Sequence, residues 1–372
     1  MKYIKANNIT LIMTETRIAI LSNFANLGGT QQLAYSFINV MKMHNYAVDV
    51  YTGYKSNFPP KNVDSVTTLK YPKLSNSNRF TILLNEVLLR RELSKIDLKS
   101  YSVTFNNQPN TFLYNASINY LHGPAFFESF MNQKGEVNNP FLYRIIRAVG
   151  IYKIYKDGIF LTHGNYTKEY SMKGFNLLNI MPREIIAINI PVQYPLVERI
   201  PNKELNTVLT FGRISPDKNL EIISNISRQV PARFIIAGYI SKDHIEYVRK
   251  LKNIMPDNVT FIENPSETDK INLYTRANIY LHTKPREHFG LTVAEALWFG
   301  CIPVVPKSGG AWEDIVSNGR YGYGYDNEED LTSIINDIRT DRIGDEVFAS
   351  RFRFSMETFA DKLTEIISRI AH

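Results

Sequence analysis

The sequence predicts an α/β protein of two doubly wound, Rossmann-like domains that face each other across a cleft. Short β-branched runs alternate with amphipathic helical stretches along all 372 residues, which is typical of parallel sheets with helices on both faces. The alternation occurs twice, and a proline-interrupted stretch at residues 191–201 separates the two copies. Chains of this length usually fold as two or three domains, so each copy is expected to form one.

In the first copy, the stretch Thr30–His44 is expected to be a helix, because Leu33, Phe37 and Met41 recur at helical spacing. A second amphipathic stretch, Thr81–Ile96, carries basic residues as well as leucines. The strands expected here are Arg17–Ser22, Ala47–Thr52, Tyr101–Phe105, Ile118–Leu121, Ile159–Thr162 and Ile185–Ile190.

In the second copy, the expected strands are Val208–Phe211, Arg233–Ala237, Val259–Glu263, Asn278–Leu281, Ile302–Pro306 and Tyr321–Tyr325. Helices are expected between them at Asp217–Arg228, Asp243–Leu251, Ser266–Thr275, Thr292–Phe299 and Ala311–Ser317, followed by a last amphipathic helix at Ser355–Ile370. We therefore divide the chain into domains at residues 1–195 and 196–350, with a C-terminal helix at 351–372.

Composition and charge exclude several classes of protein. A 44% share of apolar residues and a 21% share of charged residues are typical of a globular protein. The single Cys301 cannot form an internal disulfide, which favours a reducing compartment, and neither a signal peptide nor a membrane span is expected.

Residues 1–200 hold 22 lysines and arginines against 12 acids, a net of +10, whereas residues 201–372 hold 21 against 24, a net of −3. The basic half is therefore either a surface for an anionic partner or an ordinary solvated face.

Two acids, Glu287 and Glu295, stand eight positions apart around the start of an expected helix. The first N–H groups of a helix lack intrahelical partners and suit a phosphate. Glu287 precedes the turn and can reach a polar ligand. Glu295 lies one turn into the helix, where it is expected to face the same opening and can accept hydrogen bonds from a diol such as a ribose. Both acids could equally be solvated helix-end residues. The N–H groups at the helix start that suit a phosphate belong to Phe289, Gly290, Leu291 and Thr292.

Two cations, Arg213 and Lys218, follow another expected strand, with Gly212 permitting the turn between strand and loop. Paired cations at the end of a strand would neutralise a diphosphate, although such a pair is also common on ordinary surfaces. Asp217 is expected to cap the helix that follows.

Two further strand ends carry candidate ligand contacts. Gly28 and Gly29 lie between the first expected strand and its helix, where they either allow close approach of a ligand or form a plain turn. His122 follows another strand and either bonds a sugar hydroxyl or serves as a core or capping histidine. The other histidines show no metal-ligand spacing and no Asp-x-Asp pair is present, so no metal ligand is expected.

Taken together, three segments resemble glycosyltransferase family 4, which has the GT-B fold and transfers sugars with retention. The resemblance is specific over about residues 205–325, and the run Glu287–Gly290 is most similar to mannosyltransferases that build lipid-linked oligosaccharides. The segments are Gly212-Arg213 with Lys218, Glu287–Glu295, and Ser308–Val316.

The resemblance implies a role for each site residue. Arg213 and Lys218 would bind the donor diphosphate, Glu295 the ribose and Glu287 the donor sugar, with His122 also touching the sugar. The last helix would cross back to the N-terminal domain. Gly28 and Gly29 would pack against the diphosphate, and the amides of Phe289, Gly290, Leu291 and Thr292 would surround the sugar and the phosphates. The departures Thr30-Gln31 and Thr283-Lys284 stand where the family often has Ala-Glu and Pro-Ser.

The sequence is therefore interpreted as a metal-independent, retaining hexosyltransferase, with mannose as the favoured sugar. Its partners would be a GDP- or UDP-linked sugar nucleotide, used as substrate with no cofactor, and a glycan or lipid-linked acceptor. The expected location is cytoplasmic, with peripheral contact between an anionic membrane and the basic half. The alternatives are a glucosyltransferase that modifies nucleic acid, which is disfavoured, and a non-catalytic protein that binds sugar nucleotides.

Overall fold

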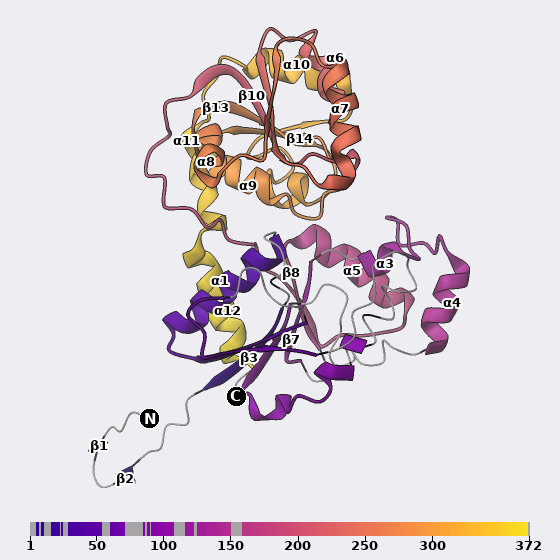
Figure 1. The fold of residues 1–372 in the computed structure, drawn as a ribbon, viewed down its shortest axis with the longest axis vertical. Helices are drawn as coiled ribbons and strands as arrows, with labels where there is room; N and C mark the ends of the chain where they lie inside the picture. The colour runs from indigo at the N-terminus through magenta and orange to yellow at the C-terminus, as the bar shows by residue number, and fades with distance from the viewer. Residues whose placement is uncertain are drawn as a thin grey trace. The chain divides into compact units, whose positions relative to one another are not determined.

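The structure is a computed structural model that describes residues 5–6, 9–10, 16–22, 24, 29–53, 60–70, 85, 88–89, 91–107, 116–122, 125–149 and 158–370. The chain divides into two compact units. Unit 1 comprises Met1–His163, Thr167–Pro191 and Phe359–His372, and unit 2 comprises Gly164–Tyr166 and Val192–Thr358. Residues 188–203 contain neither helix nor strand, and the C-terminal helix α12 (Met356–Ser368) begins in unit 2 and ends in unit 1 (Figure 1).

Unit 1 is built on a seven-stranded parallel sheet in the order β5-β4-β3-β6-β7-β8-β9. The chain leaves β3 toward one edge through β4 and β5 and then returns to the other side of β3 through β6. The strands are β3 (Arg17–Leu21), β4 (Ala47–Thr52), β5 (Ser65–Thr68), β6 (Val103–Asn106), β7 (Ile118–Leu121), β8 (Ile159–Thr162) and β9 (Glu184–Ala187). A separate two-stranded antiparallel pair joins β1 (Lys5–Ala6) to β2 (Ile9–Thr10).

Helices of unit 1 bury their apolar stripes against this sheet. Leu33 and Phe37 of α1 are buried as their spacing predicts, and the ring of Phe37 stacks on Phe105 of β6 at 4.0 Å between centroids. The other described helices are η1 (Leu98–Ser100), α3 (Ala125–Glu128), α4 (Pro140–Val149) and α5 (Asn165–Leu177), and α1 itself spans Gly29–Met43. Of the expected helix Thr81–Ile96, residues 85, 88–89 and 91–93 are helical, and seven of its 16 positions lie outside the described residues.

Unit 2 is built on a six-stranded parallel sheet in the order β12-β11-β10-β13-β14-β15 (Figure 1). The strands are β10 (Glu204–Arg213), β11 (Arg233–Tyr239), β12 (Val259–Glu263), β13 (Ala277–Leu281), β14 (Ile302–Pro306) and β15 (Tyr323–Tyr325). The helices are η3 (Pro216–Lys218), α6 (Ile222–Ser227), η4 (Lys242–His244), α7 (Ile245–Ile254), α8 (Glu267–Arg276), α9 (Leu291–Trp298), the π-helix η5 (Ala311–Ile315), α10 (Glu328–Ile338), α11 (Asp345–Ala349) and η6 (Ser350–Phe354). Two parallel sheets with helices confirm the predicted α/β class.

Some elements differ from the sequence expectation for identifiable reasons. All four residues of β5 are exposed, so this edge strand shows no apolar alternation. Helix α5 is polar and contains Gly174, whose missing Cβ would lie 2.3 Å from the ring of Phe127. Asp217 was expected to cap a helix, but it lies inside η3, and α6 begins only at Ile222 with Glu221 as its N-cap.

Candidate functional site

The candidate site lies where the strand order of unit 2 reverses. From β10 the chain proceeds through β11 and β12 to one edge, and it then returns to the other side of β10 as β13. The loops that follow β10 and β13 are therefore neighbours at the carboxyl edge of the sheet. In open parallel sheets a ligand binds at this kind of switch point. The two motifs that carry Arg213 and Glu287 follow these two strands.

Lys218 and Glu287 form the central ion pair of the site. The Nζ of Lys218 lies 2.7 Å from Oε2 of Glu287, and the two side chains are 22% and 19% exposed. The Oγ1 of Thr283 donates a 2.6 Å hydrogen bond to the backbone carbonyl of Lys218, which ties the two loops together. The structure thus brings Lys218 and Glu287 together across 69 positions of sequence.

The charged side chains around this pair alternate in sign. Lys284 lies 3.6 Å from Glu287 and 3.4 Å from Asp217, and Asp217 lies 3.7 Å from Arg213. We call these five residues the switch-point cluster. Its three cations and two carboxylates carry a net charge of +1, so an anionic ligand can bind there without first displacing an excess of negative charge.

The surroundings of the cluster perturb two ionisable groups. Burial alone would raise the pKa of Glu287, but Lys218, His282 and Lys284 together lower it to about 2. Burial lowers the pKa of His282 to about 4, against the opposing effect of Glu287. His282 is 5% exposed and its Nε2 has no hydrogen-bond partner among the residues that the structure describes. At neutral pH the site therefore holds an ionised Glu287 and a neutral His282.

Two glycines hold the loop that carries Glu287 against η5. The N–H of Gly310 donates a 2.7 Å hydrogen bond to the carbonyl of Glu287. A Cβ on Gly309 would lie 2.6 Å from that same carbonyl oxygen, and a Cβ on Gly310 would lie 2.1 Å from the carbonyl oxygen of His288. Real Cβ atoms do not approach so closely, so both positions require glycine. The Gly-Gly pair of the sequence motif thus positions the backbone next to Glu287.

The start of α9 presents backbone N–H groups beside the cluster. Gly290 is the N-cap with φ 92°, a conformation that favours glycine, and Leu291 and Thr292 are the first two helical residues. In a helix the first N–H groups have no carbonyl four residues earlier within the helix. Phe289 is 4% exposed and packs edge-on against Phe354, which anchors the turn. The predicted donor groups therefore lie on a fixed turn.

Glu295 differs from the sequence expectation. Its side chain is only 4% exposed, whereas we expected it to face the same opening as Glu287. One carboxylate oxygen accepts a 2.9 Å hydrogen bond from Lys270, and the other accepts a 3.0 Å hydrogen bond from the hydroxyl of Tyr274. Burial raises the pKa of Glu295 even though these two donors oppose the shift. Glu295 and Glu287 thus have separate partners, and Glu295 lies inside the unit.

In unit 1, His122 directly follows β7, the strand beside β6. Nε2 of His122 lies 2.6 Å from Oδ1 of Asn107, which serves as the acceptor because the Asn107 amide donates to Ser22 and to the carbonyl of Thr30. Burial lowers the pKa of His122 to about 3. His122 is therefore neutral and has its Nε2 engaged. Gly29 begins α1 with no heavy atom near its missing Cβ, and Gly28 lies outside the described residues.

Sequence reasoning missed three members of the site. Lys284 and Thr283 were noted only as departures from a family pattern, and His282 was considered only as a metal ligand. Their place directly after β13 was the available signal, because the residues that follow neighbouring strands meet at one edge. Lys270 was also missed, since a lysine within a helix normally points to solvent.

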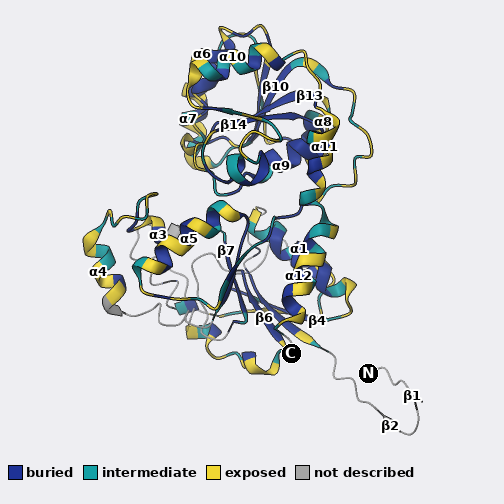
Figure 2. Ribbon diagram, turned by 180° about the vertical axis from the view of Figure 1, so that it is seen from behind, coloured by how far each residue is buried: buried dark blue, intermediate teal, exposed yellow. Residues whose placement is uncertain are grey.

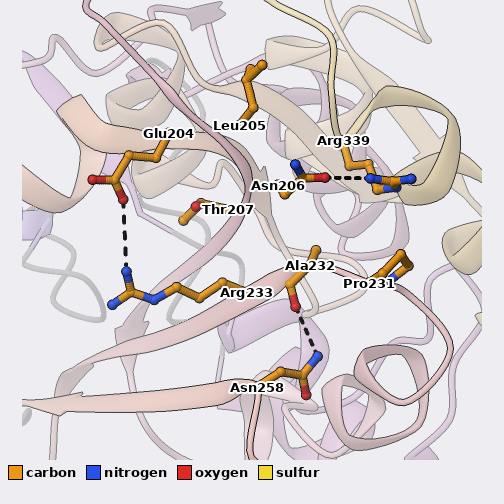
Figure 3. Close-up of a pocket in the computed structure, with 9 residues that line it drawn as sticks. All are labelled: Glu204, Leu205, Asn206, Thr207, Pro231, Ala232, Arg233, Asn258 and Arg339. Carbon is orange, nitrogen blue, oxygen red and sulfur yellow. Dashed lines mark hydrogen bonds and ion pairs between the residues drawn. The ribbon is translucent and has the colours of Figure 1, made fainter.

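A separate hollow of about 590 Å³ lies at the opposite, amino edge of the unit 2 sheet (Figure 3). Arg233 lies 3.9 Å from Glu204, and Arg339 donates a 2.6 Å hydrogen bond to Asn206. The charged groups of this hollow therefore already have partners within it. It lies away from the switch point and holds none of the residues predicted from the sequence.

Comparison with known proteins supports the same part of the chain. Residues 197–353 match the family model of glycosyl transferases group 1. A GDP-Man:Man(3)GlcNAc(2)-PP-Dol alpha-1,2-mannosyltransferase of Dictyostelium discoideum is 24% identical over 56% of this chain and 47% of its own length. A human alpha-1,3/1,6-mannosyltransferase ALG2 is 24% identical over 47% of this chain and 49% of its own, and a glycogen synthase of Clostridium kluyveri is 27% identical over 37% and 31%. The chain thus spans at most about half the length of these relatives.

Solved structures match nearly the whole chain. Anabaena HepE in complex with UDP and glucose superposes with a TM-score of 0.68, at 17% identity over 95% of this chain and all of that one. Sucrose-phosphate synthase of Thermosynechococcus elongatus gives a TM-score of 0.70 at 14% identity, over 96% and 99%. At this identity the likeness establishes the fold alone, which is GT-B. The fold expected from the resemblance is confirmed: the chain has the GT-B fold, and its residues 197–353 match the family model of glycosyl transferases group 1.

Proposed function

We propose that the protein is a retaining glycosyltransferase that moves a hexose, with mannose favoured, from a nucleoside diphosphate sugar to a glycan or glycolipid acceptor. The observation that carries the proposal is the switch-point cluster, in which Lys218 and Glu287 meet at 2.7 Å within a group of net positive charge. Two of the relatives are named as mannosyltransferases, one of them with a GDP-mannose donor. The HepE structure holds UDP and glucose, so a UDP-linked donor is the second candidate.

The cluster suits the chemistry of a leaving diphosphate. When the bond between the anomeric carbon and the phosphate oxygen breaks, its electron pair goes to that oxygen, and negative charge grows on the diphosphate. In this proposal Arg213, Lys218 and Lys284 stabilise this charge, which accelerates the step because the stabilisation is greatest in the transition state. The acceptor oxygen attacks the same face of the sugar, and its proton passes to the departing phosphate oxygen. No metal ion is required in this scheme.

The remaining residues are assigned roles within this proposal. Glu287 would bind hydroxyls of the donor sugar, since its low pKa keeps it ionised as an acceptor. The first N–H groups of α9 would bind a phosphate. Glu295 would hold the ribose only through lone pairs that Lys270 and Tyr274 leave open. His122, with neutral imidazole, would contact the sugar.

A reducing, cytoplasmic location fits this function best. Cys301 is the single cysteine of the sequence, and it is fully buried. Among the helices of the described residues, none combines the length and the apolar character that crossing a bilayer requires.

A thermal-shift panel of GDP-mannose, UDP-glucose and ADP-glucose tests the donor. Tight binding raises the melting temperature by mass action, and we expect GDP-mannose to give the largest shift. Lys284→Ala tests the cluster. Lys250→Ala is its matched control, because Lys250 is a 73% exposed lysine on α7 and is not a member of the cluster. We expect Lys284→Ala to reduce the shift and Lys250→Ala to leave it unchanged. If no sugar nucleotide shifts the unmodified protein, the proposal fails.

A further inference from the structure

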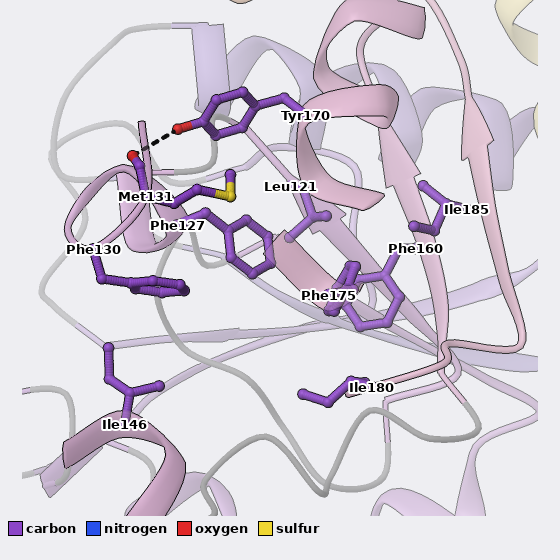
Figure 4. Packing of buried hydrophobic residues seen from close by; sticks show 10 residues of the cluster. All are labelled: Leu121, Phe127, Phe130, Met131, Ile146, Phe160, Tyr170, Phe175, Ile180 and Ile185. Carbon is purple, nitrogen blue, oxygen red and sulfur yellow. Dashed lines mark hydrogen bonds between the residues drawn. The ribbon is translucent and has the colours of Figure 1, made fainter. Parts of the chain in front are cut away.

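One face of helix α4 packs against the buried core of unit 1. Ile146 is 8% exposed and belongs to a buried cluster with Phe130, and Leu142 and Tyr143 pack against the same cluster. Figure 4 shows Ile146 pointing from its helix toward Phe130. The hydroxyl of Tyr143 also donates a 2.9 Å hydrogen bond to the carbonyl of Leu177. This face fixes the helix on the body of the unit.

The other face of α4 exposes large apolar side chains. Phe141 is 76% exposed and Ile145 is 42% exposed. They stand four positions apart, which places them on one side of the helix, one turn from each other. Figure 2 shows the exposed face of α4 on the outside of unit 1. Exposed apolar residues are common singly, whereas an aromatic and a β-branched residue side by side on an amphipathic helix mark a candidate contact surface.

Cations flank this apolar pair. Arg144 and Arg147 are both exposed, and with Val137, Pro140 and Tyr143 they line a hollow of about 530 Å³. The guanidinium of Arg147 lies over the ring of Tyr143 at 5.7 Å from its centroid, which directs it along the helix surface. From Val137 to Lys156 the sequence contains four basic residues and no acid.

We propose that α4 docks on an anionic membrane surface, with Phe141 and Ile145 entering the interface and Arg144 and Arg147 binding lipid phosphates. A helix with an apolar stripe beside arginines is the arrangement that lies in a bilayer interface. The charge favours anionic lipid over a second copy of this chain, whose unit 1 sequence is itself basic. Two apolar side chains also cover far less than the roughly 1,000 Å² that a stable protein interface needs.

Vesicle co-sedimentation tests this docking without any glycosyl transfer, so its outcome is independent of the proposed function. We expect the protein to bind vesicles that contain phosphatidylserine at low salt, and to bind pure phosphatidylcholine much less. Arg144→Gln with Arg147→Gln should weaken binding roughly tenfold or more, and Phe141→Asp with Ile145→Asp should abolish it. Met43→Asp and Lys250→Gln are matched controls that should bind normally, since Met43 is 70% exposed on α1.

Insertion of the helix is measured by a second readout. Phe141→Trp should be quenched by brominated lipid, whereas Met43→Trp should not. Unchanged circular dichroism and an unchanged melting temperature show that each variant is folded. Equal vesicle binding by the unmodified protein and by Phe141→Asp with Ile145→Asp overturns the proposal, as does equal binding to neutral and anionic vesicles. A dimer that the double aspartate variant converts to monomer, without any lipid binding, assigns the face to a second copy and also overturns it.

Discussion

Nζ of Lys218 lies 2.7 Å from Oε2 of Glu287, although the two residues belong to loops after different strands. Each side chain is about one-fifth exposed, so the pair is shielded from bulk water yet open to a ligand. Solvent therefore screens this pair less than it screens an ordinary surface ion pair. When a diphosphate binds, Lys218 can interact with both the anion and Glu287.

Replacing Lys218 by Ala should lower kcat by roughly 100-fold or more, because it removes a cation that stabilises the developing charge. Steady-state kinetics with the donor identified by thermal shift measure the effect. Lys250→Ala is the matched control and should retain full activity. A Lys218→Ala enzyme with normal kcat would refute the role of this lysine in the reaction.

Stability should fall in acid through Glu287. Its pKa is about 2 in the folded protein and about 4.3 when unfolded, so the unfolded state binds the proton first as the pH falls. The ion pair therefore stabilises the fold fully above about pH 4.5, and the contribution disappears as the pH approaches 2. Urea unfolding from pH 5 to 2.5 should show a shallower loss of stability in Glu287→Gln than in the unmodified protein. Parallel curves would contradict the shifted pKa.

His282 should add a second acid-sensitive step at higher pH. Its folded pKa is about 4 and its unfolded pKa is about 6.5, so its stabilising effect is present above pH 6.5 and decreases as the pH falls toward 4. We expect His282→Gln to remove part of the stability change between pH 6.5 and 4, measured by urea unfolding. His44→Gln is the control, because His44 is exposed directly after α1. The same pH dependence in all three proteins would contradict this expectation.

Lys270 and Glu295 should depend on each other for stability. Both are nearly buried, so Lys270→Met leaves a carboxylate without its counter-ion and should cost about 3–5 kcal/mol of unfolding free energy. Adding Glu295→Gln should recover much of that loss, because glutamine is neutral and can still accept a hydrogen bond from Tyr274. Urea unfolding of the single and double variants measures the coupling. Strictly additive losses would show that the two side chains are energetically independent.

Gly310 should tolerate no side chain. Alanine there would place a Cβ 2.1 Å from the carbonyl oxygen of His288, so the loop beside Glu287 has to move. We expect Gly310→Ala to lower the melting temperature and weaken donor binding. Gly344→Ala is the matched control, since no heavy atom lies within 4 Å of its missing Cβ and its φ is −72°. A normal melting temperature and normal donor binding for Gly310→Ala would show that the close contact is not essential.

Most of the sheet architecture could be predicted because buried parallel strands leave a strong signal. Residues 18–21 and 277–281 are buried along their whole length, and such short, mostly apolar runs are typical of strands buried on both faces. The exposed strand β5 and the polar helix α5 contain no buried apolar run of this kind. Their structure depends on contacts with neighbouring elements, which local patterns do not encode.

The candidate site was only partly predictable. Arg213, Lys218 and Glu287 could be selected because each stands in a loop that follows an expected strand. Local sequence therefore determined which residues stand at the carboxyl ends of the strands, since alternation and glycine turns mark those ends. Only the tertiary structure decided that Lys218 pairs with Glu287 while Glu295 turns inward to Lys270. The physical reason is that pairing and burial depend on distances between segments that lie 25 to 69 residues apart, and these distances exist only once the sheet and its helices have packed.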